Sequence, residues 1–231
     1  MWGFKKVIKE EVLTEIEVEE ESVNKVYVNT KQEVYKLKFS QKAYILFKSF
    51  VEWNLALIAT LMLIPVWVVL WIVIKCDSKG PAIFKQDRIG KKRKLFKCYK
   101  WRSMPVTAAS NVASKDSNYG SNVTKVGKFI RKTSIDELAQ LFNILTGKVS
   151  LIGYRPLIPN ETEIDNIRMK KGIYQIKPGI TGWAQVHGRV LIGDEEKANY
   201  DEYYLRNISL WLDIKIFFLT IKKVLTREGT K

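Results

Sequence analysis

The chain has 231 residues, 46% of them hydrophobic, and its formal net charge at pH 7 is +15. This length allows one domain with a substantial core, and the composition excludes a chain that is disordered throughout. Two cysteines without metal-binding spacing and a single histidine argue against a Cys/His zinc site and against a Ser-His-Asp triad.

The positive charge lies outside residues 1–40, which hold seven Lys/Arg and eight Asp/Glu. The rest of the chain therefore carries a net charge of +16. Such a charge indicates an anionic partner, namely nucleic acid, anionic lipid headgroups or a phosphorylated substrate. Because no nucleic-acid recognition motif or repeat occurs, we expect no nucleic-acid partner. Residues 1–40 themselves lack a signal peptide's apolar region and fit either a strand or two or a mobile tail.

An apolar segment at residues 55–74 reads LALIATLMLIPVWVVLWIVI. About 20 such residues suffice for a helix to span a bilayer. Pro65 at its centre favours a sharp kink. Lysines flank both ends, and the positive-inside rule places both flanks on the cytoplasmic side. The sequence therefore favours a re-entrant hairpin, helix–break–helix, with a kinked spanning helix as the alternative.

The residues before this segment fit the same interpretation. Lys48 belongs to the basic flank, and Glu52 and Asn54 are expected at the depth of the lipid headgroups.

Two segments with alternating polarity follow, AIFKQDRI and LFKCYKW, joined by a polar GKKRK loop. This pattern predicts a β-hairpin. Arg88, Lys100 and Arg102 lie in or just after the strand patterns. A buried cation needs an anionic partner, so these three side chains are candidates for ligand binding.

An acidic pair stands out in TSIDELAQLFNIL, residues 133–145. One interpretation is capping, in which Ser134 is the N-cap of an apolar helix and Glu137 completes a capping box. The other is chemical. Beside Arg131 and a helix N-terminus we expect Asp136 to favour its ionised form, which suits a nucleophile or a Mg²⁺ ligand. The two roles are compatible.

Two later segments point to phosphate. Arg155 follows the strand-like VSLIGY, and KPGITGWAQVHGR combines the turn Pro178-Gly179 and Gly182 with Arg189. A glycine-bearing loop with arginines nearby is a candidate phosphate cradle.

The last segment, ISLWLDIKIFFLTIKKVL, places six apolar residues on one helical stripe: Leu210, Ile214, Phe217, Phe218, Ile221 and Leu225. The stripe fits a core-facing helix or an interfacial amphipathic one. Trp211 and the lysines favour the interface.

Six motifs in this order resemble the bacterial sugar transferase family: GPAIFKQDRIG, KWRSM, TKVGKFIRKTSIDELAQLFNIL, GKVSLIGYRP, KPGITGWAQVHGR and YDEYYLRNISLWLDIKIFFLT. The resemblance covers about residues 42–225. Members are small monotopic phosphoglycosyl transferases, which start polysaccharide and glycoconjugate assembly on a polyprenyl phosphate carrier.

The resemblance implies an α+β fold, predominantly α, with a re-entrant membrane helix, interfacial amphipathic helices and a small β-hairpin. It divides the chain into an N-terminal extension at 1–40, a membrane helix at 41–76 and a cytoplasmic catalytic domain at 77–231. The expected location is the bacterial inner membrane, with the active site on its cytoplasmic face. The oligomeric state stays open, with a homodimer as one candidate.

The implied reaction transfers a sugar-1-phosphate from a UDP-sugar to undecaprenyl phosphate and releases UMP. The catalytic Asp-Glu dyad of the family falls on Asp136 and Glu137, with Asp136 forming a covalent phosphosugar intermediate and both residues serving Mg²⁺. The substrate-binding positions implied by the matching motifs are Arg88, Lys100, Arg102, Arg131, Arg155, Pro178, Gly179, Thr181, Gly182, Gln185, His187 and Arg189. The alternative function is a non-catalytic, membrane-associated lipid-binding scaffold of a polysaccharide assembly complex.

The chain departs from the family pattern at four positions. Tyr154 replaces the first proline of Gly-Pro-Arg-Pro, and Ala139 replaces a proline after the dyad. Ile64 replaces the serine that commonly precedes the membrane proline. His187 stands where most members have asparagine or serine, a difference that bears on sugar choice.

Overall fold

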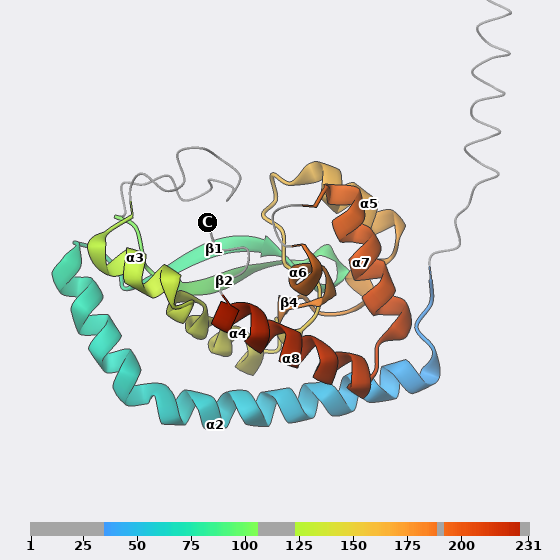
Figure 1. Cartoon of the computed structure of the whole chain (residues 1–231), viewed down its shortest axis with the longest axis horizontal. Helices are drawn as coiled ribbons and strands as arrows, with labels where there is room; N and C mark the ends of the chain where they lie inside the picture. The colour runs from blue at the N-terminus through green and yellow to red at the C-terminus, as the bar shows by residue number, and fades with distance from the viewer. Residues whose placement is uncertain (1–34, 106–122, 189–191, 227–231) are drawn as a thin grey trace, which may run out of the picture. The chain divides into compact units, whose positions relative to one another are not determined.

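The computed structural model describes residues 35–105, 123–188 and 192–226, which belong to one compact unit that begins at Tyr35. This unit is mostly helical and contains two small sheets (Figure 1). The predicted N-terminal extension lies almost entirely outside the described residues.

The apolar segment forms a single long helix, α2 (Phe39–Asp77), with Pro65 inside it. Figure 1 shows this helix bending in its second half. A proline in a helix interior removes a backbone hydrogen bond and favours such a bend. The predicted break is not confirmed, because the helix continues through the proline. Within the described residues α2 is long and apolar enough to cross a membrane.

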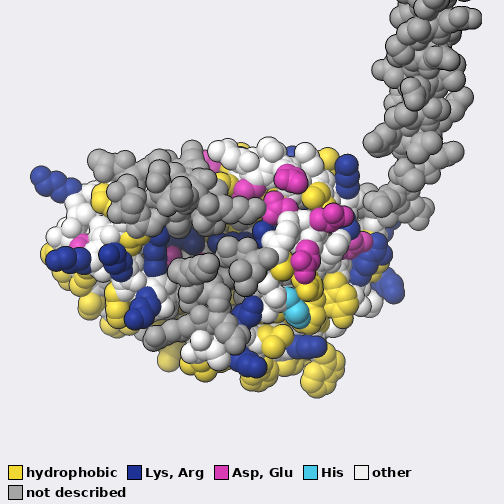
Figure 2. Space-filling view, turned by 45° about the horizontal axis from the view of Figure 1, so that its top comes forward, with side chains coloured by type: hydrophobic (Ala, Val, Ile, Leu, Met, Phe, Trp, Pro, Cys, Tyr) yellow, Lys and Arg dark blue, Asp and Glu magenta, His cyan; other side chains and the backbone are white. Residues whose placement is uncertain are grey.

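One side of α2 packs on the rest of the protein along its whole length. The buried positions are Gln41, Lys48, Glu52, Ala56, Trp67 and Ile74. The other side exposes large apolar residues, among them Phe50, Met62 and Val69. Figure 2 shows apolar side chains gathered along the lower edge of the protein.

The predicted β-hairpin is confirmed. Strands β1 (Ile83–Ile89) and β2 (Leu95–Trp101) pair antiparallel, from Ile83 opposite Trp101 to Ile89 opposite Leu95. A short helical turn, η1 (Lys91–Arg93), joins them. Both strands coincide with the segments whose alternating polarity predicted the hairpin.

The segment with the acidic pair consists of three short helices: α3 (Lys125–Lys132), η3 (Ile135–Gln140) and α4 (Leu141–Leu145). They form one core with the hairpin and the second half of α2. In that core the ring of Trp67 lies 6.4 Å from that of Trp101, and it also contacts the exposed Phe142 at 4.8 Å.

The remaining elements surround a second, parallel sheet in which β3 (Ser150–Ile152) pairs with β4 (Gly179–Thr181). The helices are α5 (Thr162–Lys170), η4 (Ile173–Gln175), α6 (Trp183–His187), α7 (Asp194–Asn207) and α8 (Leu210–Thr226).

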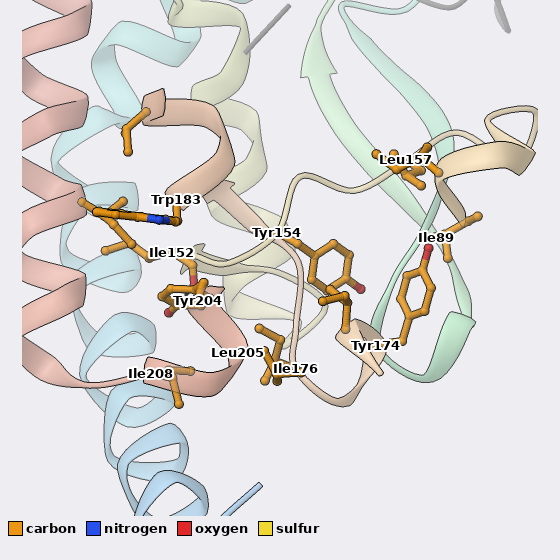
Figure 3. Close-up of a cluster of buried hydrophobic side chains, with 14 residues drawn as sticks. Ile89, Ile152, Tyr154, Leu157, Tyr174, Ile176, Trp183, Tyr204, Leu205 and Ile208 are labelled. Atoms are coloured by element: carbon orange, nitrogen blue, oxygen red, sulfur yellow. Dashed lines mark hydrogen bonds between the residues drawn. The ribbon is translucent and has the colours of Figure 1, made fainter. Parts of the chain in front are cut away.

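Figure 3 shows the second core, which these elements share with the hairpin end at Ile89. Tyr154 is fully buried there, with its ring edge-on to that of Tyr174 at 5.4 Å and under the guanidinium of Arg168. The tyrosine at this position therefore adds to the core.

A buried polar network holds the first half of α2 against the parallel sheet of β3 and β4. The ammonium of Lys48 lies 2.8 Å from Asp213 Oδ2 and donates to the Ile152 carbonyl and the Tyr204 hydroxyl. Glu52 accepts hydrogen bonds from the Ser150 hydroxyl. The expectation that Lys48 is a membrane flank and Glu52 a headgroup contact is wrong, because both side chains are buried against the sheet.

The predicted stripe of α8 faces outward. All six of its residues are exposed, whereas Asp213 and Ile216 on the opposite side are buried. Of the two interpretations from sequence, the core-facing one is excluded.

Candidate active site

The acidic pair lies on η3, directly after α3. The predicted capping box is wrong. Ser134 has the left-handed φ of 56°, and its side chain makes no cap hydrogen bond. The N–H of Glu137 instead donates to the backbone carbonyl of Ser134, at 3.2 Å. The pair therefore stands on a tight 3₁₀ turn, and its side chains are not needed to cap a helix.

Lys100 of β2 binds both carboxylates. Its ammonium donates to Glu137 Oε1 at 3.2 Å and lies 3.9 Å from Asp136 Oδ2. All three side chains are partly buried. The predicted Lys100 is thus brought to the predicted dyad, and it neutralises one of its two negative charges.

Burial raises the pKa of Asp136 above its ordinary value, and the neighbouring charge of Glu137 raises it as well. The cations Lys100 and Arg131 act in the opposite direction but do not overcome the burial. The pKa of Asp136 is therefore shifted up and not down, opposite to the direction expected from sequence. A partly buried, cation-flanked carboxylate of this kind is typical of functional sites.

Arg131 reaches the dyad from the end of α3. Its Nε donates to the hydroxyl of Ser103 at 2.8 Å. The start of α3 is capped by Thr124, whose hydroxyl accepts from the N–H of Gly127. A Cβ at Gly127 would lie 2.1 Å from the Ser103 carbonyl oxygen, so only glycine lets α3 pack this closely beside the end of the hairpin.

Further charged groups act on the middle of β2. Burial raises the pKa of the Cys98 thiol, and the charges of Lys100, Arg88, Glu137 and Arg155 act on that pKa as well. Arg88 donates to the Pro156 carbonyl at 3.0 Å and so links the hairpin to the segment that carries Arg155.

Arg102 has a structural task instead. Its guanidinium is buried and donates to the carbonyls of Ile74, Ser78 and Lys79, which closes the C-terminal end of α2. These bonds occupy donors that substrate binding would need. Its predicted substrate contact stays a prediction.

The glycines of the predicted phosphate cradle hold two backbones close together. A Cβ at Gly179 would lie 2.1 Å from the N of Gly153, and one at Gly182 would lie 1.8 Å from the Gly153 carbonyl oxygen. The Gly179 N–H donates to the Tyr154 carbonyl, so it is not open to a phosphate. Pro178 accepts from the Ser150 N–H through its carbonyl.

Three other predicted positions lie at the end of β4 and in α6. Thr181 shares a hydrogen bond with Thr220 at 2.8 Å, and Gln185 donates to the Ile180 carbonyl. His187 lies among aromatic rings, 3.9 Å from Trp183 and stacked on Tyr200 at 5.1 Å. Arg189 lies outside the described residues. The substrate roles of these positions stay predictions.

Two buried residues that hold the site together escaped the sequence reasoning. Asn143 accepts from the Tyr99 N–H and donates to the Lys97 carbonyl, which fixes the edge of β2 beside Lys100. The Ser103 hydroxyl accepts a hydrogen bond from Arg131. Asn143 could have been found, because it is a lone polar residue in the apolar stretch LFNIL. Nothing in the sequence around Ser103 indicates its contact with Arg131.

The donor set fits Mg²⁺ in part. Among the described residues, no group of three or more His, Cys, Asp or Glu lies together as a metal cluster. Asp136 and Glu137 nevertheless supply two neighbouring carboxylates. Mg²⁺ is commonly held by one or two protein carboxylates together with substrate phosphates and water.

Comparison with known proteins agrees with these motifs. A family model described as bacterial sugar transferase matches residues 43–227. The chain is 41% identical, over 183 residues, to a UDP-N-acetylgalactosamine-undecaprenyl-phosphate N-acetylgalactosaminephosphotransferase of Aeromonas hydrophila, covering 76% of this chain and 43% of that protein.

Two further relatives show the same range of similarity. A UDP-glucose:undecaprenyl-phosphate glucose-1-phosphate transferase of Escherichia coli (strain K12) is 40% identical over 73% of this chain and 38% of its own length. The uncharacterized sugar transferase EpsL of Bacillus subtilis (strain 168) is 42% identical over 68% of this chain and 76% of its own length. The chain thus spans less than half the length of the first two relatives.

Proposed function

This chain belongs to the bacterial sugar transferase family, and from that premise we propose that it transfers a sugar-1-phosphate from a UDP-sugar to undecaprenyl phosphate. The observation that carries the proposal is the partly buried pair Asp136 and Glu137, held by Lys100. A lipid-binding scaffold needs no such pair. The relatives named above act on undecaprenyl phosphate, which suggests the class of acceptor.

In the first step a carboxylate oxygen of Asp136 attacks the phosphorus that bears the sugar. A bond forms between this oxygen and phosphorus, and the bond from phosphorus to the bridging oxygen breaks. The electron pair leaves with UMP. The sugar-1-phosphate is then held on Asp136 as an acyl phosphate, a form of nucleophilic catalysis by a carboxylate.

In the second step a phosphate oxygen of undecaprenyl phosphate attacks the same phosphorus. Asp136 leaves as a carboxylate, and the product is the undecaprenyl diphosphate sugar. Phosphoryl transfer depends mainly on positioning and charge neutralisation. Lys100 and Arg131, whose charges act on Asp136, supply the cations at the reacting centre. Glu137 positions Lys100 through their hydrogen bond.

Mg²⁺ is part of the proposal as an ion held by Asp136 and Glu137 together with the donor's diphosphate. When bound, it would neutralise charge on the diphosphate.

We place the protein at the cytoplasmic face of the bacterial inner membrane, with α2 re-entering that face. Support comes from both ends of α2, which bind the same compact unit. Gln41 donates to the carbonyls of Leu205 and Arg206, and Arg102 closes the other end at Ile74. A helix tied to one domain at both ends does not carry those ends to opposite sides of a bilayer.

The covalent route is tested by intact-mass measurement. Purified protein in detergent is given Mg²⁺ and a UDP-sugar without the lipid acceptor, across a panel of UDP-sugars. We expect UMP release of about one equivalent and a mass increase equal to one sugar phosphate, which disappears when undecaprenyl phosphate is added. Normal product formation from a protein that never gains mass would contradict the intermediate.

The topology is tested with cysteines introduced at the two ends of α2. Ser40→Cys and Lys79→Cys are each placed in a Cys76→Ser background, which keeps only the buried Cys98, and exposed to a membrane-impermeant maleimide in oriented vesicles. Both should react from the cytoplasmic side. Labelling from opposite sides would show that α2 spans the membrane.

A further inference from the structure

A second basic site lies at the far end of the hairpin from the dyad. It is a pocket of about 770 Å³ between the start of α2, the turn η1 and the segment around η4. Among the described residues eleven line it, of which four are Lys or Arg and none is Asp or Glu: the cations are Lys42, Lys91, Lys92 and Arg93.

Most of this positive charge has no carboxylate partner among the described residues. Arg93 pairs with Asp165 at 2.6 Å. Within the described part of the chain, no ion pair joins Lys42, Lys91 or Lys92 to a carboxylate. The charge of Lys91 also acts on Lys177, whose pKa is lowered mainly by burial. Like charges gathered in one hollow favour an anionic ligand.

The pocket has an apolar side as well. Leu37, Ile45 and Leu46 line it from the start of α2. Leu46 is exposed and belongs to the outward apolar surface that also includes Phe39 and Phe50. A pocket with cations on one wall and an aliphatic wall that continues into a membrane-facing surface suits an amphiphile rather than a free ion.

The pocket is separate from the candidate active site. Leu95, next to the η1 turn, and Lys100, at the dyad, stand five residues apart on β2. At about 3.3 Å per strand residue this separates them by roughly 17 Å. A ligand in the pocket therefore does not contact the reacting groups.

We propose that this pocket binds the headgroup of an anionic phospholipid of the bilayer, with its phosphate against Lys42, Lys91 and Lys92 and its glycerol and first methylenes against Leu37, Ile45 and Leu46. The proposal rests on the membrane placement above. Bound lipid would anchor the start of α2 and the hairpin tip at the same depth, which fixes the orientation of the hairpin relative to the bilayer.

The test measures binding of short-chain lipids to the full chain in detergent, by native mass spectrometry and by the shift in melting temperature. Dihexanoyl phosphatidylglycerol should bind one to one and saturably. Dihexanoyl phosphatidylcholine and soluble glycerol phosphate should each bind at least about tenfold more weakly, since one lacks net charge and the other lacks the apolar contacts.

Matched variants separate a site from general attraction. Lys42→Gln/Lys91→Gln/Lys92→Gln should lose the bound phosphatidylglycerol. Lys75→Gln/Lys79→Gln/Lys222→Gln removes the same charge elsewhere on the surface and should keep it. Both variants should retain UMP release in detergent, so a failed lipid test leaves the proposed transferase function untouched. As a measurement that needs no variant, a photoreactive phosphatidylglycerol should label residues 37–46 and 91–93 of the natural chain.

Three outcomes would overturn the proposal. Equal binding of the two lipids would remove the role of charge. Equal loss in both triple variants would reduce the effect to general electrostatic attraction. Glycerol phosphate binding as tightly as phosphatidylglycerol would assign the pocket to a soluble phosphate ester.

Discussion

Two clusters in this protein contain the same groups, one lysine and two carboxylates, but differ in how deeply they are buried. In the α2 network, the side chains of Lys48, Glu52 and Asp213 are 8–9% exposed. Two carbonyl or hydroxyl oxygens accept from Lys48, and Asp213 accepts from two tyrosine hydroxyls.

The dyad cluster is more open. Lys100, Asp136 and Glu137 are 22%, 14% and 21% exposed, and their contacts are longer, at 3.2 and 3.9 Å. A ligand cannot reach a fully buried cluster, whereas it can reach a partly exposed one. The comparison therefore fits a folding role for the first cluster, and it agrees with the proposed catalytic role of the second.

The largest effect expected from this comparison is on catalysis. Asp136→Asn removes the nucleophile while keeping the size of the side chain, and we expect transfer to fall at least about 1,000-fold. UMP release with UDP-sugar, Mg²⁺ and polyprenyl phosphate measures it. Asp87→Asn is the matched control, because Asp87 is an exposed partner of Lys97 away from the dyad. Wild-type turnover of Asp136→Asn would refute the nucleophile.

A change in the buried α2 network should instead lower the stability of the folded protein. Asp213→Ala leaves the ammonium of Lys48 buried without its closest carboxylate, at 2.8 Å in the intact protein. Breaking a buried pair from one side costs about 3–5 kcal/mol of unfolding free energy. Denaturant unfolding in detergent measures the loss. Asp87→Ala, which breaks an exposed pair, should cost less than about 1 kcal/mol. Similar costs for both would mean that the α2 network adds little.

The comparison also shows how far the sequence alone could lead. The hairpin was predictable because polarity alternates along both of its strands. The dyad's location was predictable because an acidic pair interrupts a basic, apolar context. Neither inference required knowledge of distant contacts.

The buried network around Lys48 on α2 was not predictable from the sequence. Lys48 looked like a membrane flank and Glu52 like a headgroup contact, since their partners Asp213 and Ser150 lie 165 and 98 positions away. The capping box failed for a related reason. Packing at η3 places Ser134 at a positive φ, and local propensity carries no information about that. The same burial reversed the expected pKa direction at Asp136.

A smaller effect concerns the pH dependence of catalysis. Lys100 lowers the pKa of Asp136, and burial raises it by more. Lys100→Gln removes the lowering influence, so the pKa of Asp136 should rise further and the acid limb of the rate profile should move to higher pH. The measurement is the initial rate of UMP release between pH 5 and 9.

The neighbouring Lys97→Gln provides the control, because that lysine pairs with Asp87 instead. Its acid limb should stay in place. A limb that moves to lower pH in Lys100→Gln, or moves equally in both variants, would contradict the assigned role of Lys100.

The smallest expected effect is on the stability of the folded protein, through the protonation of Asp136. Because the folded state raises the pKa of Asp136 above its unfolded value, the native protein binds that proton more tightly. Stability from this group is fully present below the unfolded pKa and is lost as pH rises through the folded pKa. Asp136→Asn should therefore raise Tm by a few degrees at pH 7, and the gain should vanish near pH 4 and below.

Thermal scans in detergent at both pH values measure this gain, with Asp87→Asn again as the reference that should show none. A variant that loses transfer and gains stability is expected where a buried carboxylate is retained for chemistry at a cost to the fold. If Asp136→Asn instead melts earlier at pH 7, the carboxylate stabilises the fold through Lys100 as Asp213 does through Lys48. The distinction between the two clusters would then rest on exposure alone.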